Sequence, residues 1–138
     1  MARRNKPPWK AIAAAVGVLG VGAFAYSRLT RKPEPRGRIA LIGDSYAVGL
    51  GPELERLLVP TGFYEGFEYE GHVGASTQQW LSRIASGQWG TKIATFKPKT
   101  VLVSLGVNDG ATPNPDFYRA LVMMFQAGGA RVIWIQPP

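Results

Sequence analysis

Residues 38–58 read RIALIGDSYAVGLGPELERLL and contain the two patterns that decide the fold. The first pattern, residues 38–43, is a short apolar run with two isoleucines and a terminal glycine, which predicts a buried strand. The second pattern, residues 46–59, places four leucines at helical spacing with glutamates on the other side, which predicts an amphipathic helix. A buried strand followed at once by a helix is the repeating unit of an α/β sheet.

The same alternation continues beyond this unit. Three further apolar runs predict strands, and two helical patterns predict helices between them. In chain order these segments are 67–73 (strand), 77–86 (helix), 100–105 (strand), 116–127 (helix) and 131–135 (strand). Each strand is a nearly continuous apolar run, which is typical of a parallel sheet covered on both faces. We therefore predict a flavodoxin-like three-layer α/β sandwich whose parallel sheet has about four strands.

Local signals refine this prediction. Asn114 or Asp116 is expected to cap the helix at 116–127, because their short polar side chains accept hydrogen bonds from the first free N–H groups. Trp80 and Trp134 lie within apolar patterns, and we expect both of them in the core.

Polar residues follow three of the predicted strands, at the edge of a parallel sheet where ligands usually bind. Asp44-Ser45 follows the first strand, Gly74 lies in the loop after the second, and Asn108-Asp109 follows the third. Taken singly, Ser45 could serve only as a helix cap, Gly74 only as a loop glycine, and Asn108 only in a turn. Together they place a hydroxyl, a backbone N–H and a side-chain amide on one rim. An acyl-transfer enzyme needs these parts as a nucleophile and as donors to an oxyanion.

These residues resemble the SGNH (GDSL-type) hydrolases. IGDS at 42–45, Gly74, and GVND at 106–109 match the first three sequence blocks of that family in order. The resemblance covers about residues 38–138. It implies a serine ester hydrolase that acts through an acyl-enzyme on an acylated glycan, a lipid or a small ester, without a metal or an organic cofactor.

The resemblance also implies a role for each matched residue. Ser45 would be the nucleophile. The oxyanion hole would comprise the backbone N–H groups of Ser45 and Gly74 and the side-chain amide of Asn108. Asp44 and Asp109 match positions that support the loops of the site in the family.

The fourth block of the family, a late D-x-x-H that supplies the general base, has no match in this sequence. The single histidine, His72, lies between the matched serine and asparagine. Three explanations are open: the sequence is part of a longer active esterase, it is a catalytically incomplete SGNH-like binding or structural module, or a base comes from His72 or from another chain. The sequence stops after the fourth predicted strand, so we also expect an uncovered sheet edge through which chains associate.

Composition excludes several other classes of protein. The chain has 138 residues without cysteine, which excludes disulfides, cysteine-based zinc sites and a cysteine nucleophile. One histidine excludes a His-rich metal site. The net charge of +7 comes from residues 1–38, which hold nine of the sixteen Lys and Arg but one of the nine acidic residues, whereas residues 39–138 sum to −1. A nucleic-acid-binding domain needs a basic face within its fold, so we expect no nucleic-acid partner.

The basic residues of the first segment flank an uncharged run, AIAAAVGVLGVGAFAYS, at residues 11–27. As a helix it would be about 25 Å long, at the short limit for crossing a bilayer. It could be a retained signal anchor, a signal peptide cleaved near residues 23–25, or a buried helix of a soluble protein. We thus predict a hydrophobic transmembrane helix or signal peptide at 1–27, a Pro-rich linker at 28–37 and an SGNH-like domain at 38–138. The protein would be membrane-anchored or exported, on the periplasmic or extracellular side.

Overall fold

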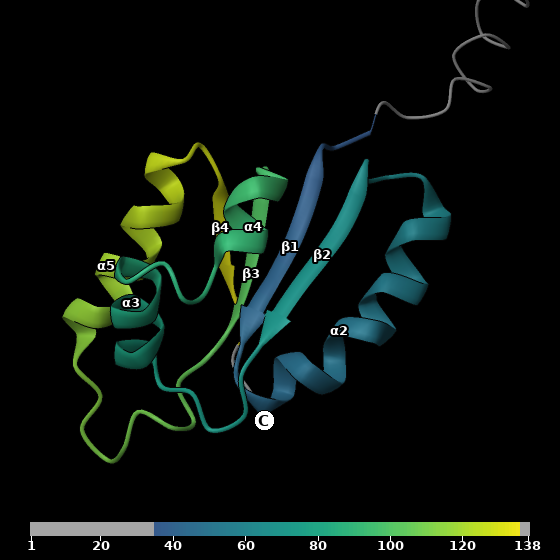
Figure 1. Ribbon diagram of the computed structural model, residues 1–138. Coiled ribbons are helices and arrows are strands. Elements are labelled where there is room, and N and C mark those ends of the chain that lie inside the picture. Colours follow the sequence, from purple (N-terminus) through teal and green to yellow (C-terminus); the bar gives the residue numbers. More distant parts are fainter. Residues whose placement is uncertain (1–34, 136–138) are drawn as a thin grey trace, which may run out of the picture. The chain divides into compact units, whose positions relative to one another are not determined.

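The computed structural model describes residues 35–135. Figure 1 shows this part of the chain as a sheet with helices on both faces. The hydrophobic helix predicted at 1–27, with the membrane contact predicted for 11–27, lies outside the described residues, as does most of the linker predicted at 28–37. Between residues 35 and 135, no helix has the length and apolar character needed to cross a bilayer.

Four strands form one sheet in the spatial order β2-β1-β3-β4. They are β1 (Arg38–Gly43), β2 (Gly66–Gly71), β3 (Thr100–Ser104) and β4 (Arg131–Trp134). All neighbouring strands run parallel, and in the register of the sheet Ile39 of β1 pairs with Phe67 of β2 and Thr100 of β3. This strand order is that of flavodoxin-like sheets. The prediction of a flavodoxin-like parallel sheet of about four strands is confirmed.

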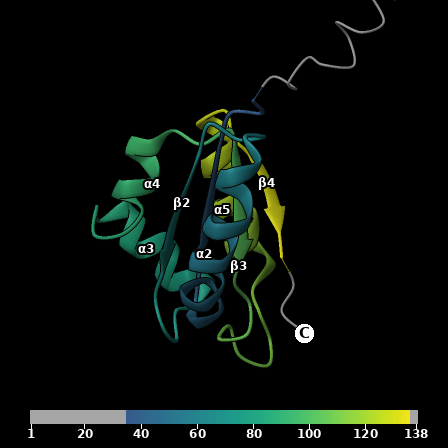
Figure 2. The same ribbon diagram turned by 90° about the vertical axis from the view of Figure 1, so that its right-hand side faces the viewer.

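Helices cover both faces of the sheet (Figures 1 and 2). They are α2 (Ser45–Leu58), followed by the 3-10 turn η1 (Val59–Thr61), and then α3 (Thr77–Ala85), α4 (Thr91–Phe96) and α5 (Pro115–Ala127). The helix α2 packs against β1 and β2 on one face, and the other three helices lie on the opposite face. Every predicted strand and helix is present with ends that differ by at most two residues. The helix α4 is an addition that the sequence patterns did not predict.

The helix ends explain why some elements were easier to predict than others. Asn114 caps α5, because its side-chain oxygen accepts a hydrogen bond from the N–H of Asp116 at 2.9 Å, which decides between the two predicted caps. In contrast, α4 begins after Gly90 and ends at Lys97, both with left-handed backbone, and neither end has a side-chain cap. A helix of six residues without caps leaves almost no signal in the sequence.

The core has one layer on each face of the sheet. The larger layer lies under α3, α4 and α5, and contains Trp80, which is fully buried as predicted. Trp134, predicted in the core, is only half-buried, and that prediction is corrected. It lies on β4, which has a single hydrogen-bonded neighbour within the described residues. Its ring packs edge-on against Tyr118 and its indole N–H donates to the carbonyl of Leu105 at 3.0 Å.

The second face is less complete over β3 and β4. Because α2 lies over β1 and β2, Leu102 and Ile135 are only partly buried and Ile133 is 36% exposed. Figure 2, turned so that α2 faces the viewer, shows β4 at one edge of the sheet. The expected association of chains through this edge stays a prediction.

The first turn of α2 lies very close to the ends of two strands. A side chain at Gly43 would collide with the backbone oxygen of Ser104, and one at Gly71 would come within 2.7 Å of the Val48 nitrogen. Ala47, on the inner side of the same turn, is fully buried. Only very small residues therefore allow the start of α2 to sit against the sheet in this position.

Candidate active site

Three loops meet the carboxyl edge of the sheet, at the end to which the arrowheads of β1 and β2 point in Figure 1. They follow β1, β2 and β3 and carry Asp44, Ser45, Gly74, Asn108 and Asp109, the residues predicted from the sequence to form the site.

Asp44 caps α2 and is 1% exposed. One oxygen of its carboxylate accepts a hydrogen bond from the N–H of Tyr46 at 2.9 Å. Ser45 is the first residue of the helix and is exposed. The interpretation of Ser45 as a mere helix cap is therefore wrong, because the cap is its neighbour. An exposed hydroxyl at the positive end of a helix has a favourable position for a nucleophile, since the helix dipole stabilises negative charge there.

Asn108 joins the three loops. Its side-chain nitrogen lies 3.2 Å from the second carboxylate oxygen of Asp44 and 3.2 Å from the carbonyl oxygen of Ala75. The interpretation of Asn108 as only a turn residue is incomplete, because its amide bridges the loops after β1 and β2. A primary amide has two N–H donors. Both have protein acceptors here, so donation to an oxyanion requires release of one, and the neutral carbonyl of Ala75 is the weaker partner.

Gly74 lies in the loop after β2. The N–H of Ala75 donates to the carbonyl of His72 at 3.0 Å and closes a four-residue turn. Gly74 is the third residue of this turn and has a φ of 74°, which a type II turn requires at that position. The glycine thus has a structural reason to be there. It is also exposed, and open space lies where a side chain would stand.

Asp109 ties the loop after β3 to the start of α3. Its two carboxylate oxygens accept hydrogen bonds from the N–H and the hydroxyl of Thr77, each at 2.6 Å. Tyr118 of α5 approaches the same carboxylate. Burial, and then the hydrogen bond with Asp109, raise the pKa of Tyr118 to about 12. Sequence reasoning missed Thr77 and Tyr118, although a tyrosine three residues before Leu121 on the apolar side of a helix signals a hydroxyl that needs a partner.

The raised pKa of Tyr118 predicts how stability depends on alkaline pH. Between pH 10.0 and about 12 the unfolded chain releases the phenol proton while the folded chain keeps it, so the free energy of unfolding falls as the pH rises. We expect this fall to be less steep in Tyr118→Phe, which has no proton to release. Urea unfolding of both proteins at about pH 9 and about pH 11 measures the difference. Parallel pH dependence in the two proteins would contradict the assignment.

Two donors fix the residue before Asp44. The indole N–H of Trp80 and the backbone N–H of His72 both donate to the carbonyl of Gly43, at 3.1 and 3.0 Å. Trp80 is thus the buried support beneath the loop that carries Ser45. This role was not predicted, because an apolar pattern shows that a tryptophan is buried but not where its indole N–H donates.

The side chain of His72 contacts a carboxylate and two tryptophans. Its Nε2 lies 2.9 Å from Glu70 Oε1, and its ring stacks on Trp89 at 3.8 Å and meets Trp80 edge-on at 5.4 Å. Within residues 35–135, no hydrogen bond joins the His72 ring to Ser45. A carboxylate beside a histidine is what a general base needs for its orientation, but the role of His72 as a base stays a prediction.

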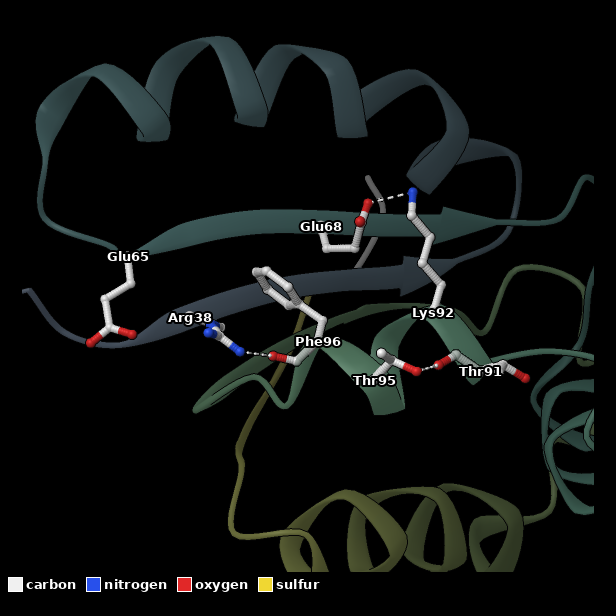
Figure 3. Close-up of a pocket in the computed structure, with 7 residues that line it drawn as sticks. All are labelled: Arg38, Glu65, Glu68, Thr91, Lys92, Thr95 and Phe96. Carbon is white, nitrogen blue, oxygen red and sulfur yellow. Dashed lines mark hydrogen bonds and ion pairs between the residues drawn. The ribbon is translucent and has the colours of Figure 1, made fainter.

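A groove lined by residues of β2 and α4 extends to His72. Figure 3 shows its first part, a cavity of about 620 Å³ lined by seven residues: Arg38, Glu65, Glu68, Thr91, Lys92, Thr95 and Phe96. Lys92 pairs with Glu68 at 2.5 Å, and the hydrogen bond with Glu68 raises the pKa of Lys92. A second cavity, of about 510 Å³, shares Thr91 and Lys92 and extends to His72. The lining of the two cavities includes both acidic and basic side chains, of which Lys92 and Glu68 form an ion pair.

Among residues 35–135, no three acidic or histidine side chains are grouped so that they could hold a metal ion.

The described residues form a flavodoxin-like parallel α/β sheet, and the loops that follow β1, β2 and β3 meet at its carboxyl edge. The chain is similar to the crystal structure of the acetyl xylan esterase AlAXEase, with a TM-score of 0.50, 20% identity, and coverage of 70% of this chain and 56% of that one. It is also similar to a catalytic mutant of Axe2, an acetylxylan esterase from Geobacillus stearothermophilus, with a TM-score of 0.52, 16% identity, and coverage of 75% and 61%.

These similarities establish the fold alone, because sequence identities of 20% and 16% do not show a shared function. The match spans 56% and 61% of the length of the two esterases. No family model matches the chain, and no curated protein matches its sequence.

Proposed function

We propose that this chain carries the nucleophile and oxyanion hole of a serine ester hydrolase. Ser45 attacks the carbonyl carbon of an ester, and the negative charge on the carbonyl oxygen is held by the N–H groups of Ser45 and Gly74 and by the amide of Asn108. Collapse of this intermediate expels the alcohol and leaves an acyl group on Ser45, which water then removes. The observation that carries the proposal is the bridge from Asn108 to Asp44 and Ala75, because it ties the amide to the residue that directly precedes the exposed serine.

The likeness in fold and the groove support one substrate class over the others. The two similar structures are acetylxylan esterases, which favours an acetylated glycan over a lipid or a small aryl ester. The groove along β2 is lined by the ion pair of Lys92 with Glu68, by two threonines and by Phe96, and these hydrogen-bonding groups support a polyhydroxylated substrate.

A serine hydroxyl at neutral pH needs a general base. His72 is the single histidine of the printed sequence, and its Glu70 partner could orient it. The other sources are the late D-x-x-H block of a longer chain and a histidine from another chain. The variant His72→Gln distinguishes His72 from these sources, because it lowers the labelling described below by orders of magnitude only if His72 is the base.

A second function has its own support. The chain could be a non-catalytic SGNH-like binding or structural module, held at a membrane by residues 11–27. The observation that favours it is that both amide hydrogens of Asn108 already have protein acceptors.

A fluorophosphonate probe separates the two functions, because it reacts covalently with activated serine nucleophiles. We expect the full chain to take up one probe molecule, located by peptide mass mapping on the fragment that contains Ser45. Turnover of acetylated xylo-oligosaccharide, compared with that of p-nitrophenyl acetate, then tests the substrate class. No labelling at any serine would remove the esterase proposal for this chain and leave the binding module.

Replacement of Asn108 tests the oxyanion hole. We expect Asn108→Ala to slow labelling at Ser45 by about 100- to 1,000-fold, the usual effect of removing one oxyanion donor. Asn114→Ala is the matched control, since it removes another asparagine that only caps a helix. It should lower stability by about 1 kcal/mol and leave the labelling rate unchanged. A labelling rate in Asn108→Ala within a factor of three of the unmodified chain would exclude the role of the amide.

A further inference from the structure

A cleft between α4 and α5 lies apart from the candidate active site. It is next to the amino ends of β3 and β4, whereas Ser45 is at the carboxyl edge of the sheet. Figure 1 shows α4 and the last turns of α5 at this end of the molecule. The cavity has a volume of about 450 Å³, within the range of small-molecule sites. Nothing in the proposed ester hydrolysis uses it.

The walls of the cleft are apolar. They are formed by six side chains, Ile84, Ile93, Ala94, Met124, Phe125 and Ala130. Ile93 and Ala130 are buried, whereas Ile84, Met124 and Phe125 pack on the core but stay partly exposed. Partly exposed apolar side chains around a concave space are a source of binding energy, because an apolar ligand removes their surface from water.

The charged residues that line the cleft are Lys97 and Lys99, and no acidic residue lines it. Lys97 has a φ of 53° and is the single non-glycine residue with left-handed backbone in residues 35–135. Backbone in this region is strained for a residue with a side chain, and such strain is concentrated at functional sites. The cleft therefore combines an apolar interior with two cations.

We propose that this cleft binds a straight-chain carboxylate of medium length, such as a fatty acid. The alkyl chain lies between Ile93, Met124 and Phe125, and the carboxylate is paired with Lys97 and Lys99. The apolar walls exclude a fully polar anion. The cleft also favours an anion over a neutral or cationic ligand, because two lysines and no acidic residue line it. This site does not depend on the proposed esterase activity.

The methionines of the chain provide a direct probe of the site. Met124 lines the cleft, Met123 is its exposed neighbour on α5, and the third methionine is Met1. The experiment titrates decanoate into the full chain, labelled with ¹³C-methyl methionine, in a fixed amount of non-ionic detergent. We expect the Met124 methyl signal to shift saturably and the Met123 methyl signal to stay unchanged. Octanoate should bind about 15-fold more weakly, since each buried methylene contributes about fourfold.

Three variants complete the test. Lys97→Gln with Lys99→Gln should weaken decanoate binding by about three- to tenfold but leave binding of decanol unchanged. The control Arg119→Gln removes an exposed cation of α5 that does not line the cleft, and it should change neither. Ala94→Phe, at an exposed position on the wall, should block binding of both ligands.

Several results would overturn the proposal. One is the absence of a saturable shift at Met124, and another is an equal shift at Met123. Unchanged decanoate binding in the double lysine variant would also overturn the proposal. Because both lysines are exposed, this variant is expected to fold and tests the site even if Ala94→Phe fails to fold. None of these results depends on labelling at Ser45, so failure of this site and failure of the esterase proposal are distinguishable.

Discussion

Ser45→Ala is expected to reduce fluorophosphonate labelling of the chain to background, a loss of about 1,000-fold or more. The variant removes the atom that forms the covalent bond, and no other group on the carboxyl edge of the sheet can replace it. The measurement is the pseudo-first-order rate of probe incorporation in the two proteins at equal concentration. Labelling in Ser45→Ala above about one-tenth of the original rate would show that the probe reacts elsewhere.

Folding should not confuse this result. Asp44, and not Ser45, caps α2, and alanine is at least as good as serine inside a helix, so the free energy of unfolding should be unchanged or slightly higher. Ser76→Ala is the matched control, because Ser76 also lies at the start of a helix but accepts the capping hydrogen bond itself. That variant should lose about 1 kcal/mol of stability and keep its labelling rate.

Trp80→Ala is expected to be the most destabilising substitution, with a loss of about 3–5 kcal/mol. The side chain is fully buried in the larger core layer, and its removal leaves a cavity that the flanking strand and helices cannot fill. Such a loss is a large part of the total stability of a small domain, about 5–15 kcal/mol. Urea unfolding followed by circular dichroism measures it, and a loss below about 1 kcal/mol would contradict the role of Trp80 in the core.

A more conservative variant separates packing from the hydrogen bond. Trp80→Phe keeps an aromatic ring but removes the indole N–H that donates to Gly43. We expect it to cost about 1–2 kcal/mol and to slow labelling at Ser45, because Gly43 directly precedes the loop with the nucleophile. Trp89→Phe is the control, since Trp89 is half-buried and stacks on His72 without contacting that loop. Equal labelling rates in the two variants would show that the indole bond has no positioning role.

The sheet was predictable because its strands carry strong local patterns. The central strands β1 and β3 are apolar and largely buried, and burial on both faces of a parallel sheet requires this. The strand β2 at one edge is only partly buried and includes Glu68 and Glu70. The prediction was wrong for Trp134, because a residue pattern does not show that β4 lies at an edge with one neighbour. It missed α4, because six residues between Gly90 and Lys97 without caps carry no clear periodicity.

The candidate site was predictable in position but not in its connections. That Asp44, Ser45 and Asn108 lie near one another follows from the common edge of parallel strands. The hydrogen bonds between these residues could not be predicted, because they join positions that are far apart in the sequence. Asn108 and Asp44 are 64 positions apart, and Thr77 and Asp109 are 32 positions apart. Such contacts depend on loop conformations that tertiary packing determines.

The close fit of α2 against the sheet has a consequence for motion. Gly43 and Gly71 lie against backbone atoms that cannot yield, and Ala47 is buried between them. The serine at the start of this helix is therefore held on a rigid support and cannot swing toward an arriving molecule. Gly74 and Asn108, in contrast, lie in the loops of residues 72–76 and 106–114 and not on a packed helix, so we expect motion at this edge of the sheet to come from these loops.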